Sequence, residues 1–163
     1  MATPTDIEQI GFNGPTGSLQ FGVHRQVIQS VGATRTLLAK EAGSLCLFDR
    51  AAGNVYTLPA PVEGMTFEFR TTVAVTSNAS KIITNAGTVF LLGSLMGGSL
   101  TVADSGDVFQ GNGTTHVAIS MSGTTTGGLI GGSIRLVAVS STVWSVEGNF
   151  VGSGTLADPF ATS

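Results

Sequence analysis

Short runs of apolar residues alternate with turn residues along most of this chain. The clearest run is MTFEFR, where Phe67 and Phe69 alternate with Glu68 and Arg70. A period of two places the two rings on one face of a strand and the two charges on the other. No segment shows apolar residues at helical spacing over three turns. The pattern therefore predicts strands, with the aromatic side chains in the core.

The same reading gives a series of strands separated by Gly, Asn, Ser or Pro. A weak strand is expected within 21–29 and one helical turn within 37–43. The segment 50–54 (RAAGN) reads as a hairpin connection between its two neighbouring strands. The stronger strands are expected at 44–49, 54–59, 65–76, 80–84, 88–92, 99–104, 115–122, 133–140 and 142–151.

Many short strands at this spacing predict an all-β fold, which we expect to be a jelly-roll-like β-sandwich. The 163 residues favour one domain, placed at 21–163. Residues 1–20 are rich in Gly, Pro, Asn and Thr and are expected to form an extended N-terminal arm.

The segment from Thr124 (TTTGGLIGGSIRL) holds four glycines ahead of a strand. A phosphate-binding loop would need a Gly-Lys-Ser/Thr end leading into a helix, and this segment has no lysine. We interpret these glycines as turn residues that adopt backbone angles other residues resist.

Composition changes the picture mainly through charge. Charged residues make up 10% of the chain and the net charge is −3, compared with roughly 25% charged residues in a typical domain. No basic patch points to nucleic acid, and no apolar run has the ~18 residues of a membrane helix. The single Cys46 cannot form an intrachain disulfide.

Candidate chemistry is sparse. The two histidines, His24 and His116, have no nucleophile motif beside them, and Asp104 and Asp107 fit a polar turn better than a calcium loop. We therefore expect no catalytic, cofactor-binding or metal-binding residues. The enzyme alternative is a small hydrolase that uses His116 with Asp104 or Asp107.

The run IRLVAV (134–139) has apolar side chains on both faces of a strand. Ile134, Leu136 and Ala138 cannot face the same core as Val137 and Val139. A subunit interface would cover the second face, and so would a second layer within the monomer. The pattern, together with the low charge, favours a homotrimer.

Two blocks of sequence carry a resemblance to a known family. They are GSLCLFDRAAGNVYTLPAPVEGMTFEFRTTVAVTSNASKI (43–82) and GTTTGGLIGGSIRLVAVSSTVWSVEGNFVGSGTLADPF (123–160). In this order they resemble the capsid decoration, or cement, proteins of tailed phages. The resemblance implies a trimer that binds the major capsid protein on the outer surface of the virion head.

Similar TLP modules occur in tail-fibre and spike proteins, so a trimeric module for receptor or glycan binding is the alternative function. Within the arm, Ile7, Ile10 and Phe12 are apolar residues in an otherwise polar segment. A few apolar anchors can hold a partner surface, and we expect these three residues to contact the capsid.

Overall fold

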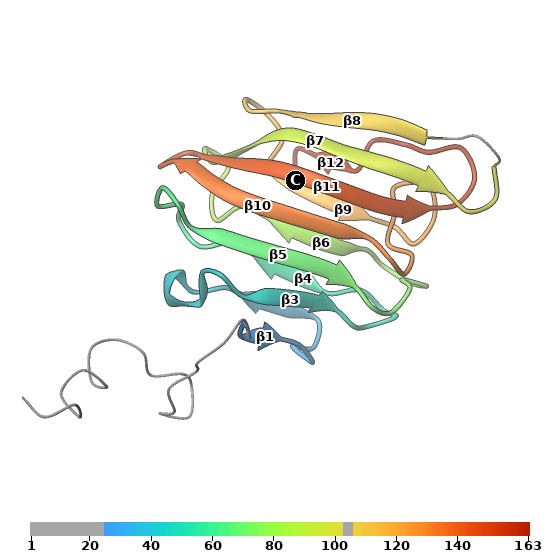
Figure 1. Cartoon of the computed structure of the whole chain (residues 1–163), viewed down its shortest axis with the longest axis horizontal. Helices are drawn as coiled ribbons and strands as arrows, with labels where there is room; N and C mark the ends of the chain where they lie inside the picture. Colours follow the sequence, from blue (N-terminus) through green and yellow to red (C-terminus); the bar gives the residue numbers. More distant parts are fainter. Residues whose placement is uncertain (1–24, 103–105) are drawn as a thin grey trace, which may run out of the picture.

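The computed structural model describes residues 25–102 and 106–163. Two β-sheets pack face to face, and in Figure 1 the larger sheet lies in front of the smaller one. We call them the large sheet, with seven strands, and the small sheet, with five. The all-β sandwich expected from the sequence is confirmed.

The large sheet contains, in spatial order, β1 (Val27–Ile28), β3 (Leu45–Phe48), β5 (Thr66–Thr71), β10 (Ser133–Ser140), β11 (Val143–Gly152), β7 (Phe90–Ser99) and β8 (Gly106–Asn112). The small sheet contains β12 (Phe160–Ala161), β9 (Ala118–Met121), β6 (Ser80–Ile83), β4 (Val55–Thr57) and β2 (Thr34–Thr36). A single turn of 3-10 helix, η2 (Ala39–Glu41), lies between β2 and β3, where the sequence predicts one helical turn.

The chain from β1 to β6 alternates between the two sheets. β1, β3 and β5 lie side by side in the large sheet, and β2, β4 and β6 do so in the small sheet, all in parallel pairs. This half of the molecule is therefore a stack of three coils, each with one strand in each sheet.

The hairpin predicted at 50–54 is not formed. β3 and β4 flank this connection but belong to different sheets, so they do not pair. The Gly53 N–H donates to the Arg50 carbonyl at 2.9 Å, and Gly53 has a φ of 78°. This tight turn carries the chain across the core from one sheet to the other.

The jelly-roll connectivity is not confirmed. A jelly roll consists of two Greek keys of antiparallel strands, whereas here both sheets are mixed. In addition to the coil strands, β7 and β11 form a long parallel pair. Antiparallel pairs join β5, β10 and β11 in the large sheet and β6, β9 and β12 in the small sheet.

Large aromatic side chains fill the space between the sheets. Phe67, Phe69 and Trp144 are each at most 1% exposed, which confirms the predicted core positions. The Phe69 ring centroid lies 5.7 Å from that of Phe48 and 5.5 Å from that of Tyr56. These spacings suit aromatic pairs.

The prediction of a separate strand at 99–104 is wrong. β7 instead runs from Phe90 through Gly93, Gly97 and Gly98 and ends at Ser99, and 100–102 form a bend. The strands β2, β8 and β12 were not predicted from the sequence. The turn interpretation of 124–132 fits the positive φ angles of Gly127, Gly128 and Gly131, at 93°, 96° and 104°. The predicted arm at 1–20, with Ile7, Ile10 and Phe12, lies outside the described residues.

Candidate functional site

Paired charges and exposed apolar side chains gather on the outer face of the large sheet. The inward positions of β5 and β10 are buried, among them Phe67, Phe69, Ile134 and Leu136. The alternate positions turn away from the core, and Val139 is 49% exposed. The two-faced strand expected at 134–139 is therefore confirmed, and its second face is an exposed surface of the monomer.

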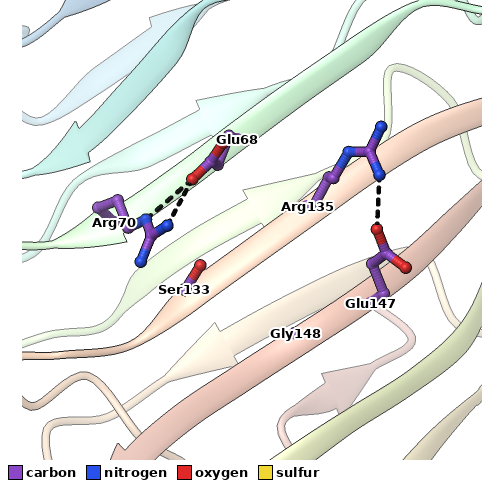
Figure 2. Close-up of a pocket in the computed structure, with 6 residues that line it drawn as sticks. All are labelled: Glu68, Arg70, Ser133, Arg135, Glu147 and Gly148. Carbon is purple, nitrogen blue, oxygen red and sulfur yellow. Dashed lines mark hydrogen bonds and ion pairs between the residues drawn. The ribbon is translucent and has the colours of Figure 1, made fainter.

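A row of paired charges crosses the middle of this face. Register places Glu68 of β5 beside Arg135 of β10, and Arg135 beside Glu147 of β11. Arg135 Nη1 donates to Glu147 Oε1 at 2.8 Å, and Arg70 Nε donates to Glu68 Oε1 at 2.9 Å. Figure 2 shows both pairs. With Ser133 and Gly148 these four residues line a shallow pocket.

Glu68 is the anchor of this row. Its second carboxylate oxygen accepts a hydrogen bond from Arg25, just before β1, so one side chain links β5 to the edge of the sheet. Partial burial raises the pKa of Glu68, but hydrogen bonds from Arg25 and Arg70 outweigh it and hold the pKa below its usual range. The carboxylate is therefore charged at neutral pH.

A Glu68→Gln variant should show a weaker loss of stability in acid than the wild type. A carboxyl group with a lowered folded pKa stabilises the fold above its unfolded pKa, near 4.5, and loses this effect as pH falls through the folded value. The difference in free energy of unfolding between the two proteins should therefore shrink below about pH 4.5. Urea unfolding at a series of pH values measures it.

Glu63→Gln is the matched control, because Glu63 is exposed and forms no ion pair with any described residue. The difference in free energy of unfolding between Glu63→Gln and the wild type should change little between pH 3 and pH 7. If the free energy of unfolding of Glu68→Gln differed from that of the wild type by a constant amount over the same pH range, the electrostatic role of Glu68 would be contradicted.

Apolar side chains flank the charges on the β7–β8 side. Leu92 and Met96 of β7 and Val108 of β8 are 47%, 61% and 61% exposed, and Met96 stands directly opposite Val108. Exposed apolar side chains bordered by polar ones are typical of protein-binding surfaces.

Among the described residues, the hydrolase candidates His116 and Asp107 lie apart. His116 Nδ1 accepts the N–H of Asn112 at the end of β8, and its ring stacks on Phe160 at a centroid distance of 5.6 Å. Asp107 lies at the start of β8, five residues before Asn112, which is roughly 16 Å along a strand. His24 and Asp104 lie outside the described residues.

The other reactive or ligand-binding candidates are core residues. Cys46 is fully buried, and burial raises the pKa of its thiol to about 12, which leaves it unreactive near neutral pH. Trp144 is also fully buried and cannot stack on a sugar. Within the described ranges, no three His, Cys, Asp or Glu side chains are grouped so that they could hold a metal ion.

In the part of the chain that the structure covers, no helix is long and apolar enough to cross a membrane. No protein-family model, no curated protein and no solved structure matches the chain. The resemblance to capsid decoration proteins therefore remains a prediction from the sequence.

Sequence reasoning found part of this surface. The alternation in 65–70 correctly predicted that the side chains of Glu68 and Arg70 face away from the core. It missed their neighbours Arg135 and Glu147, because only the pairing of β5, β10 and β11 aligns these side chains. The isolated charges at 135 and 147, each within a strand of otherwise uncharged residues, were the available signal.

Proposed function

We propose that this chain is a structural protein of a phage virion, a capsid decoration protein that binds the outer surface of the head as a homotrimer. The observation that carries the proposal is the outer face of the large sheet. It presents exposed apolar residues beside internally paired charges. Within the described residues, the hydrolase candidates His116 and Asp107 lie apart, and no three potential metal ligands are grouped. Such a face suits lasting contact between proteins.

The action we propose is mechanical. A protein that binds only the assembled shell stabilises that shell by mass action, and a trimer that spans neighbouring subunits of the major capsid protein would resist their separation. The proposal includes no enzymatic activity and no cofactor. It does not depend on jelly-roll connectivity, because any rigid sandwich can present such a face.

The resemblance and the arm supply the second part of the proposal. Ile7, Ile10 and Phe12 are the proposed capsid anchors, and the sandwich supplies the body of the trimer. Because 1–20 precede the first described strand, their removal should leave the trimer folded and weaken capsid binding.

Co-sedimentation with capsids stripped of decoration tests the proposal. Full-length protein should pellet with capsids at micromolar concentration, and the variant lacking 1–20 should need at least tenfold more protein to reach the same occupancy. Equal binding of both forms would contradict the role of the arm. Failure of the full-length protein to bind would contradict the capsid function, and binding to host cells or glycans instead would support a tail-fibre or spike module.

A further inference from the structure

The end of the large sheet formed by β7 and β8 differs from the rest of the molecule in charge. From 82 to 134 the sequence contains only two charged residues, Asp104 and Asp107, with His116 counted as neutral. This stretch includes all of β7, β8 and β9. Asp107 pairs with Gly97, on the opposite face of the sheet from Met96 and Val108.

Exposed apolar side chains are concentrated at the same end. Five of the ten exposed large hydrophobic residues in the described part of the chain fall between positions 92 and 108. We call them the apolar strip. Its members are Leu92, Met96, Leu100, Val102 and Val108, with exposed fractions from 41% to 72%.

The outer edge of β8 is also open. Among the described strands, none pairs with β8 on the side away from β7. The Gly113 N–H donates to the Leu91 carbonyl at 2.9 Å, so by the antiparallel alternation the backbone groups of Val108 and Gln110 point away from β7. Neither Lys nor Pro, which natural proteins use to block edges, occurs in β8.

We infer that the apolar strip and the β8 edge form the surface through which copies of this chain associate. Contacts around a symmetry axis bring the same residues of different copies together, so any charge near the axis meets its own like charge. Contact through the uncharged side chains of the apolar strip avoids this repulsion. A different protein partner would be selected by complementary charge, and the strip offers none for it to recognise.

Two other features of this face also favour a second copy of the chain as the binding partner. Arg135 and Glu147, on the same face of the sheet as the strip, are already paired within one chain and need no partner from another, and Asp107 of β8 lies on the opposite face. Apolar area that is exposed in one copy becomes buried against the equivalent area of the next, which supplies the main driving force for association. The inference rests on the proposed self-association and specifies the surface that performs it.

Introducing a charge into the strip tests the inference. Met96→Glu and Val108→Glu should each convert the wild-type oligomer to a monomer at micromolar concentration, with an unchanged circular dichroism spectrum. The matched control is Val62→Glu, because Val62 is 60% exposed but lies in the connection between β4 and β5. Sedimentation velocity measures the mass of each protein, and the control should keep the wild-type mass.

The outcomes separate this inference from the capsid function. A monomeric wild type, strip variants that keep the wild-type mass, or dissociation of the Val62→Glu control as well would each overturn the inference. A wild type that forms an oligomer dissociated by the strip variants but does not bind capsids would contradict only the capsid function. If a Glu variant unfolds, Met96→Gln and Val108→Thr replace it and should raise the dissociation constant at least tenfold; an unchanged constant would again overturn the inference.

Discussion

Replacing Phe69 with alanine should lower the free energy of unfolding by about 3–5 kcal/mol. Phe69 is 1% exposed and contacts two further rings, those of Phe48 and Tyr56, between the two sheets of the coiled half of the molecule. Loss of the ring removes buried apolar area and leaves a cavity that the rigid strands around it cannot close. Urea unfolding followed by circular dichroism measures the change.

The neighbouring Glu68→Ala variant is the control. Glu68 lies on the same strand with its side chain on the outer face, and its partners Arg25 and Arg70 are 56% and 50% exposed to solvent. Surface pairs of this kind contribute about 0–1 kcal/mol. If the two variants unfolded at the same urea concentration, the assignment of the two faces of β5 would be wrong.

The second large effect is expected at Gly93, within the strand β7. Gly93 has a φ of 136°, and a Cβ atom added there would lie 2.0 Å from the carbonyl oxygen of Val146 on β11. An alanine must therefore push β7 and β11 apart or change the backbone angle, in addition to occupying a strained conformation. Gly93→Ala should destabilise the fold by about 3 kcal/mol or more.

Gly98→Ala tests whether that effect is specific. Gly98 belongs to the same strand, has no positive φ, and has no atom within 4 Å of an added Cβ. Its free energy of unfolding should stay within about 0.5 kcal/mol of the wild type. Equal melting temperatures for Gly93→Ala and the wild type would show that β7 and β11 approach each other less closely than described.

The sequence was sufficient to predict which side chains face the core wherever polar and apolar residues alternate. Phe67, Phe69 and Leu136 are buried, whereas Glu68 and Val139 turn outward, as the period of two requires. This prediction succeeds because the burial of apolar side chains does not depend on which strand lies beside them. The alternation within a single strand is therefore sufficient to identify its core-facing side.

Strand pairing could not be predicted in the same way. The connection 50–54 has the composition of a hairpin turn, yet β3 and β4 belong to opposite sheets. A turn of this kind reverses the chain in either case, and contacts made far along the sequence, such as β3 with β5, decide where the next strand lies. The coiled arrangement depends on those distant contacts.

Glycine also concealed the full length of β7, one of the two longest strands described. Gly93, Gly97 and Gly98 interrupt the apolar pattern of 90–99, so the sequence predicted two short strands there. In the structure Gly97 makes room for the ring of Phe150, whose nearest atom would lie 2.6 Å from an added Cβ. The missing side chain is a packing requirement of β11, and the interrupted pattern left Met96, a member of the apolar strip, outside the strands expected from the sequence.

The coil stack has a consequence for how this molecule can change in length. Val27, Leu45 and Glu68 occupy the same level of three successive coils. Among the described strands, only those of the last coil, β5 and β6, pair with strands from the later half of the chain. Each earlier coil depends mainly on its immediate neighbour, as in repeat proteins. Evolution or engineering could therefore add or remove one complete coil at the outer end of the stack, which would change the width of the sandwich while every pairing of the C-terminal strands stays as it is.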